Sequence, residues 1–234
     1  RNITEKYCRN CFPKQRRKAR LIKENGAQIM PYIIAITGGS GAGKTTLSNY
    51  LKQKYPHLIT QLPYDNYCVD RSNYTMEERA KINYDLPDSY DAPLFYKHIQ
   101  DLKKGLSINQ PLFDFPTHTR KEETIKVEPN QIVIIEGIMV LQVPNLKDII
   151  DLTIYVDADD DLKLSRRIMR DTKERGRTVE SVINQYLATV KPSFKKYIEP
   201  SKTEVDIVFD NNNNDGLNEK ELKKVIEKIE EVIK

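Results

Sequence analysis

From Pro31 onward, short apolar runs alternate with longer segments whose apolar residues recur every three or four positions. The runs YIIAIT (residues 32–37) and QIVIIE (131–136) are continuous and rich in β-branched residues, which is typical of buried parallel strands. Strands that alternate with helices predict an α/β fold with a parallel sheet covered on both faces. We expect Asp91 to cap the helix that begins near Pro93. Strands are predicted at residues 32–37, 59–62, 131–136, 152–157 and 205–209, and helices at 44–55, 93–105, 159–174, 178–191 and 218–234.

Composition narrows the class of protein but does not identify its chemistry. The chain has 234 residues, of which 38% are hydrophobic and 31% charged, with a formal net charge of +4. This length allows a sizeable core in one large domain. No apolar run approaches the roughly 20 residues that span a bilayer, so we expect no membrane association. Three cysteines exclude a disulfide scaffold and favour a reducing, cytoplasmic location.

The first 30 residues form a separate basic segment. Nine Lys or Arg residues face the single acid Glu5 up to Lys23. Cys8 and Cys11 form one CxxC pair, but zinc needs about four ligands and no second pair follows. We interpret residues 1–30 as a solvated arm, with contact to a neighbouring subunit as an alternative and nucleic-acid binding as an unlikely one. The domain that carries the chemistry is then 31–234.

A phosphate-binding loop follows the first predicted strand. GGSGAGKT matches G-x-x-x-x-G-K-[ST] without a gap and opens a helix, which is the context that this motif requires. Its backbone N–H groups can cradle phosphates, Lys44 can reach the β- and γ-phosphates, and the Thr45 hydroxyl can bind Mg²⁺. These features predict a P-loop NTPase fold. The strings N-K-x-D and D-x-x-G, which GTPases of this fold need, do not occur in the chain, and the segments described next are typical of a kinase acceptor site.

Two acids follow predicted strands near this loop. Asp65 comes directly after the second strand, and Glu136 closes the strand at 131–136. Because strand carboxyl ends face the ligand crevice in such sheets, Asp65 can accept a hydroxyl proton and share the Mg²⁺, while Glu136 can hold the metal through water. An acid that only starts a turn, or an ordinary acid at a strand end, is the alternative for each.

Three further segments carry unusual side chains. NYDLPDSYD (83–91) and PLFDFPTHTR (111–120) interleave acids with aromatic residues, which suits a ligand with hydroxyls and a flat ring. RRIMRDTKERGR (166–177) places Arg167 and Arg170 on one helix face, where their planar groups suit phosphate oxygens. Gly176 indicates a pivot at the edge of a lid. Plain loops and a solvated basic face are the alternatives.

Taken together, these motifs resemble the uridine–cytidine kinases of the phosphoribulokinase/uridine kinase superfamily, from Tyr32 to about Phe209. The resemblance implies transfer of a phosphoryl group from ATP (or GTP), with Mg²⁺, to the 5′-hydroxyl of uridine and cytidine in pyrimidine salvage. It also implies a substrate-binding insertion at about 64–128, a lid at about 159–191, a homotetramer, and feedback by pyrimidine triphosphates.

The resemblance assigns roles residue by residue. Asp65 is the base, assisted in catalysis by Lys44 and Arg170. The metal set is Thr45, Asp65 and Glu136. The nucleoside is bound by Asp65, by Asp85 at the ribose hydroxyls, by Phe113, Phe115 and His118 around the base, and by Arg167, Arg177 and Gln185. The donor nucleotide is bound by Gly38, Gly39, Ser40, Gly41, Ala42, Gly43, Lys44, Thr45, Thr46 and Arg175.

Two positions depart from the family pattern. The family usually has Tyr where Phe113 stands and often has an aromatic residue where Cys68 stands. Both positions line the nucleoside pocket in the family, so phosphoryl transfer is a firmer expectation than base preference. Two alternatives stay open: a kinase of another small alcohol (a different nucleoside, a sugar phosphate or pantothenate) and a non-catalytic nucleotide-binding regulator.

Overall fold

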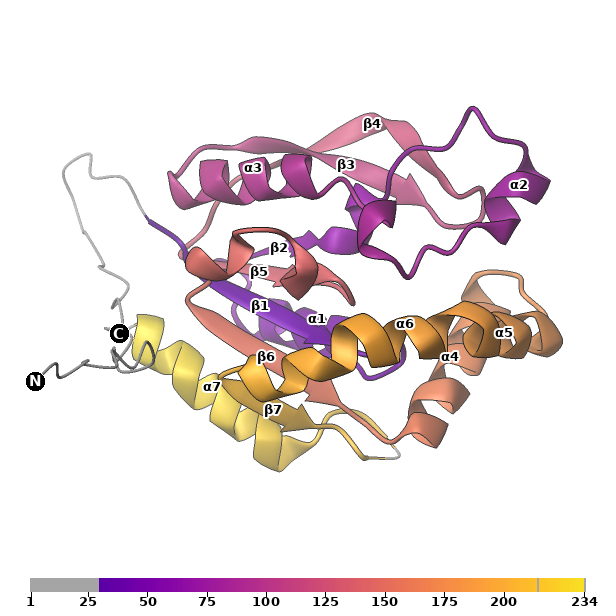
Figure 1. The fold of residues 1–234 in the computed structure, drawn as a ribbon. Helices are drawn as coiled ribbons and strands as arrows, with labels where there is room; N and C mark the ends of the chain where they lie inside the picture. The colour runs from indigo at the N-terminus through magenta and orange to yellow at the C-terminus, as the bar shows by residue number, and fades with distance from the viewer. Residues whose placement is uncertain (1–29, 214, 234) are drawn as a thin grey trace, which may run out of the picture.

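The computed structural model describes residues 30–213 and 215–233, which fold around a parallel sheet with helices on both faces (Figure 1). The predicted arm, including Cys8 and Cys11, lies outside the described residues except for Met30, which is exposed. Within the described part of the chain, no helix is both long and apolar enough to cross a membrane. The layered arrangement is the one that the alternation of strands and helices predicts.

The central sheet has five parallel strands in the order β2-β5-β1-β6-β7. Its middle strand β1 pairs with β5 on one side, where Ile36 aligns with Glu136, and with β6 on the other, where Thr37 aligns with Tyr155. The carboxyl ends of β1, β2 and β5 therefore meet at one edge of the sheet, which is where parallel sheets bind ligands. The strands are β1 (Tyr32–Gly38), β2 (Ile59–Pro63), β5 (Ile132–Glu136), β6 (Leu152–Asp157) and β7 (Ile207–Asp210).

The described residues contain seven α-helices. Asp91 caps α3 as predicted, because its carboxylate accepts a hydrogen bond from the Leu94 amide at 3.1 Å. The helix predicted to end at residue 191 instead continues through Pro192 to Ile198, because π-helical turns at Tyr186–Val190 and Phe194–Ile198 flank the short α6. The helices are α1 (Lys44–Lys54), α2 (Met76–Lys81), α3 (Ala92–Lys103), α4 (Asp160–Glu174), α5 (Val179–Gln185), α6 (Lys191–Ser193) and α7 (Glu219–Ile233).

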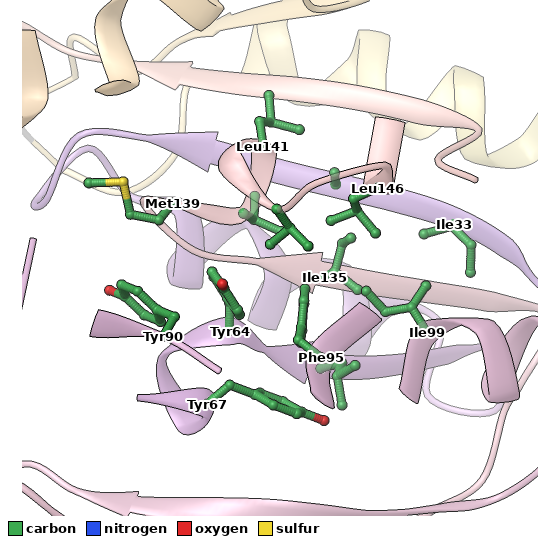
Figure 2. Close-up of a cluster of buried hydrophobic side chains, with 14 of the residues drawn as sticks. Ile33, Tyr64, Tyr67, Tyr90, Phe95, Ile99, Ile135, Met139, Leu141 and Leu146 are labelled. Carbon is green, nitrogen blue, oxygen red and sulfur yellow. The ribbon is translucent and has the colours of Figure 1, made fainter. Parts of the chain in front are cut away.

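The interior consists of two hydrophobic clusters, one on each face of the central sheet. Successive residues of a strand point to opposite faces, so Ile34 and Ile36 pack against α1 and α7, whereas Ile33 and Ala35 pack toward α3. On the α3 side, the ring centroids of Tyr64 and Phe95 lie 4.3 Å apart (Figure 2). This aromatic packing fixes the turn after β2, on which Asp65 lies.

A β-hairpin that the sequence analysis did not predict lies beside α3 (Figure 1). Its strands are β3 (Ile108–Asp114) and β4 (Thr119–Val127). Pro111 interrupts the first strand, and most of the second is charged and exposed, so neither shows the alternation that identifies a strand. Arg120 braces the hairpin: its guanidinium donates to the Cys68 carbonyl at 2.7 Å and forms a salt bridge of 3.2 Å with Asp91.

Candidate active site

The phosphate-binding loop connects β1 to α1 at the ligand-binding edge of the sheet. Close contacts and left-handed backbone require glycine at three of its positions, Gly38, Gly41 and Gly43. A Cβ on Gly38 (φ 137°) would lie 2.2 Å from the Val156 carbonyl oxygen, and one on Gly43 (φ 108°) would lie 2.5 Å from Asn211 Nδ2. Gly43 is also the N-cap of α1, so the amides at the start of this helix face the loop. The arrangement suits binding of a phosphate chain.

Asn211 supports the loop from behind, and the sequence analysis missed it. This side chain is buried, donates from Nδ2 to the Ala42 carbonyl at 2.8 Å and accepts from the Asn218 amide at 3.3 Å. It thereby joins the loop to the segment that precedes α7. The only local sign of this residue in the sequence is a run of four asparagines at 211–214, and such a run is more typical of an exposed turn.

The side chain of Lys44 is held within the phosphate-binding loop. The buried Lys44 ammonium donates to the Gly39 carbonyl at 3.0 Å, within the same loop. Burial lowers the pKa of Lys44, while the charges of Glu136, Asp65 and Asp85 oppose this shift. The ammonium therefore lies near three carboxylates drawn from separate parts of the chain.

Glu136 and Thr45 form the core of the predicted metal site. The Thr45 hydroxyl donates to Glu136 Oε1 at 3.0 Å. Burial, together with the charge of Asp65, raises the pKa of Glu136. A hydroxyl and two carboxylates supply hard oxygen ligands, and a divalent cation between the carboxylates would offset their mutual repulsion. These residues therefore fit Mg²⁺. The described residues contain no group of three or more His, Cys, Asp and Glu that could hold a metal ion by themselves, and the predicted set contains only two carboxylates.

Asp85 is a buried acid on the loop between α2 and α3. Only 7% of its surface is exposed, and burial raises its pKa, while the charge of Arg167 acts in the opposite direction. Its backbone amide donates to Asn83 Oδ1 at 2.9 Å, which holds the loop in a tight turn. Within the described chain, no hydrogen bond reaches its carboxylate, so this group is available to a ligand.

An aromatic cluster lies next to these acids. The ring of His118 stacks on Tyr84 at a centroid distance of 4.9 Å, and Phe113 meets Phe115 edge to face at 5.5 Å. Burial, followed by the charge of Arg177, lowers the pKa of His118, so its ring is neutral near pH 7 and can both donate and accept. The sequence analysis did not assign Tyr84 a role, although its ring lies 6.3 Å from that of Phe113 and its buried hydroxyl has no hydrogen-bond partner in the described chain.

The arginines of α4 and of the segment that follows it lie beside the loop. Arg167 donates to Ser40 Oγ and to Gln185 Oε1, both at 2.8 Å, and Arg177 also donates to Gln185. Arg175, expected beside the donor nucleotide, lies 4.4 Å from the centroid of the Phe115 ring. The basic segment therefore connects the phosphate-binding loop to the aromatic cluster and is not a solvated face.

This fold and these side chains define a class of protein. A P-loop, a neighbouring strand-end acid with a second acid after β2, and a cluster of arginines form the arrangement of a P-loop kinase that acts on a small molecule. The particular family follows from sequence: residues 33–217 match the phosphoribulokinase / uridine kinase family, and the chain belongs to it.

Relatives agree with this assignment, and solved structures share the fold. Proteins named uridine kinase from Clostridium novyi (strain NT) and Clostridium botulinum (strain Okra / Type B1) are 46% and 48% identical to the chain over 180 residues. These alignments cover 76% of this chain and 86% and 87% of the relatives. Phosphoribulokinase from Rhodobacter spheroides shares the fold with a TM-score of 0.56 at 14% identity, covering 77% of this chain and 70% of that one. D-glycerate 3-kinase from Cryptococcus neoformans does so with 0.55 at 18%, covering 81% and 88%.

Proposed function

We propose that the protein is a uridine kinase that transfers the γ-phosphoryl group of ATP or GTP to the 5′-hydroxyl of uridine and cytidine, yielding UMP and CMP. One observation carries the proposal: the charges of Glu136, Asp65 and Asp85 all act on the buried Lys44 ammonium of the phosphate-binding loop. A donor-phosphate site and acids suited to an acceptor alcohol thus lie together. The identity of about 47% to proteins named uridine kinase selects the nucleoside among small alcohols.

On the donor side, Gly38–Thr46 would wrap the triphosphate, with backbone N–H groups directed at its oxygens. Lys44 would leave the Gly39 carbonyl and bind the β- and γ-phosphates. Thr45, Asp65 and Glu136 would hold Mg²⁺, which supplies charge neutralisation to the phosphates. Arg170 would stabilise the charge on the transferred group.

On the acceptor side, Asp65 would orient the 5′-hydroxyl and accept its proton as the new bond to phosphorus forms. Asp85 would bind the ribose hydroxyls with its otherwise unoccupied carboxylate. Phe113 and Phe115 would contact the flat base, and His118 would read its edge with whichever ring nitrogen suits uracil or cytosine. Arg167, Arg177 and Gln185 would close over the nucleoside and phosphates, and Arg175 would bind the donor nucleotide.

The same proposal covers the larger organisation. Residues of about 64–128 act as the substrate-binding insertion and those of about 159–191 as the lid, since the aromatic cluster and the arginines belong to these two segments. We further propose, from the family resemblance, a cytoplasmic homotetramer that functions in pyrimidine salvage.

A consumption assay tests this function directly. The rate of ATP or GTP consumption is measured in the presence of Mg²⁺ with one candidate acceptor at a time: uridine, cytidine, adenosine, a sugar phosphate and pantothenate. Turnover with uridine or cytidine alone supports the proposal. Turnover with another alcohol identifies a different kinase, and nucleotide binding without turnover on any acceptor identifies a regulator. In the active case, Asp65→Asn is expected to lower kcat by about 10²–10⁴-fold while ATP still binds; near-normal turnover would refute Asp65 as the base.

A further inference from the structure

Asp171 lies at the centre of four arginines. Its side chain is fully buried, with 0% exposure, in the last turn of α4. Among the described residues, the salt bridges of these four arginines all lead to this one carboxylate. The distances are 2.8 Å from Arg170 Nη2, 3.5 Å from Arg175 Nη1, 3.6 Å from Arg167 Nε and 3.7 Å from Arg177 Nη1.

The backbone brings the later two arginines to the carboxylate. The amides of Arg175 and Arg177 both donate to the Asp171 carbonyl, at 3.3 and 3.2 Å, so the chain after α4 folds back over this residue. Gly176, between them, has a left-handed φ of 63°, which a side chain would disfavour. The carbonyl and the carboxylate of a single residue therefore determine where two of the arginines lie.

All four arginines form salt bridges with Asp171, but most of them do not donate a hydrogen bond to it. In the described chain only Arg170 of the four donates a hydrogen bond to the carboxylate, and the buried atoms Arg167 Nε and Asp171 Oδ2 have no hydrogen-bond partner there. The other end of Arg167 reaches Ser40 of the phosphate-binding loop. Within the described chain the Arg175 guanidinium makes no hydrogen bond, so its donors are available to an incoming anion.

The electrostatic balance explains why an acid is needed here. Four guanidinium groups around one carboxylate leave a strongly positive cluster beside the phosphate-binding loop. Burial lowers the pKa of both Arg167 and Arg175, and the charge of Arg170 adds to this effect in each case. The charge of Asp171 opposes it in both, together with that of Asp85 at Arg167 and that of Asp65 at Arg175. Without an internal anion, like charges at these distances would repel one another and separate. With it, the cluster stays assembled and still has excess positive charge.

We propose that Asp171 is a positioning residue that acts as an internal counter-ion. It holds Arg167, Arg170, Arg175 and Arg177 in the arrangement that stabilises the phosphoryl group during its transfer. This inference rests on the proposed kinase function. Asp171 does not touch the reacting atoms; it acts through the arginines, which bind them. The nucleotide's own charge can assemble the arginines in the ground state, whereas the brief transition state depends on groups that are already in place.

The test separates turnover from binding. Asp171→Asn keeps the shape of the side chain and an acceptor for Arg170 but removes the charge. We expect kcat to fall by about 10- to 100-fold, the scale of a misplaced catalytic group, while the Kd of a non-hydrolysable ATP analogue stays the same or decreases because a negative charge has gone. Glu174→Gln, which removes an exposed acid from the same helix, is the matched control and should change neither quantity.

Asp171→Glu restores the charge with a longer arm and should retain more turnover than Asp171→Asn. Equal turnover in the two variants, unchanged kcat in Asp171→Asn, or a loss of ATP-analogue affinity that matches the loss of kcat would overturn the proposal. If Asp171→Asn does not fold, as judged by its thermal unfolding, Asp171→Ser replaces it as the variant without the charge. A kcat in Asp171→Ser equal to that of Asp171→Glu would overturn the proposal, and a lower kcat at wild-type ATP-analogue affinity would support it. A wild-type enzyme that is inactive on uridine and cytidine but binds the ATP analogue would instead overturn the proposed function.

Discussion

The discrimination between ribose and deoxyribose provides a quantitative test of the acceptor site. Asp85 is buried, and its carboxylate receives no hydrogen bond from the described part of the chain. If it accepts hydrogen bonds from the two ribose hydroxyls, a 2′-deoxynucleoside leaves one of them unmade. A hydrogen bond to a charged group contributes about 1.5–3 kcal/mol. The expected loss in kcat/KM from cytidine to deoxycytidine is therefore about 10- to 150-fold, at about 1.4 kcal/mol for each tenfold.

A cycle of two changes isolates this contribution. kcat/KM is measured for cytidine and deoxycytidine with the wild-type enzyme and with Asp85→Asn. The neutral amide oxygen of Asn still accepts a hydrogen bond, but one of only about 0.5–1.5 kcal/mol, so the ratio should shrink to about 2- to 13-fold. Asp88→Asn is the matched control, because Asp88 is exposed on the same loop, and it should leave the wild-type ratio unchanged.

The reasoning fails in two ways that the cycle detects. A wild-type ratio near one would show that the carboxylate does not bind the 2′-hydroxyl. A large ratio that persists in Asp85→Asn would show that another group rejects deoxyribose. Binding of the ATP analogue to each variant verifies that the donor site is intact.

Three further predictions concern other parts of the site. Phe113→Tyr should lower the nucleoside KM by roughly 2- to 13-fold, the value of one hydrogen bond, without changing the ATP KM; an unchanged nucleoside KM and uridine-to-cytidine ratio would remove Phe113 from the base edge. Because burial and Asp65 raise the pKa of Glu136, its ionisation costs stability as pH rises above the ordinary glutamate range. Glu136→Gln should therefore raise the Tm of the ligand-free protein at pH 8 but not at pH 4, and equal Tm values at pH 8 would contradict this. Asn211→Ala removes the hydrogen bond from Nδ2 to the Ala42 carbonyl and leaves this buried carbonyl without its partner, at a cost of about 1–3 kcal/mol. Because the phosphate-binding loop loses this support, the ATP KM should rise several-fold while the nucleoside KM stays unchanged.

The donor half of the site is predictable from sequence because its signals are local. The glycine pattern, Lys44 and Thr45 occupy consecutive positions, and their spacing alone specifies a loop between a strand and a helix. Glu136 is similarly marked by the apolar strand that it ends, with all five residues buried. In these cases the sequence neighbours of a residue are also what determine its environment.

The residues that the sequence analysis missed depend on contacts between distant segments. Asn211 gains its role from Ala42, which lies 169 positions earlier in the chain. The place of Tyr84 in the site depends on its stacking on His118, from which α3 and β3 separate it in the sequence. Asp171 is one of two acids in the basic segment 166–177, but only the turn at Gly176 shows that four arginines converge on it. The hairpin itself was missed because its charged second strand lacks a continuous buried face.

The two hydrophobic clusters divide the molecule into parts that can open separately. β1 and β5 contribute side chains to both clusters, so their amides should exchange with solvent deuterium only when the whole domain unfolds. Amides of α3 depend on one cluster and those of α1 and α7 on the other. Hydrogen exchange should therefore resolve two cooperative units with a shared central sheet, of which a nucleotide bound at the phosphate-binding loop slows the α1 and α7 unit, and a nucleoside bound at Asp85 slows the α3 unit.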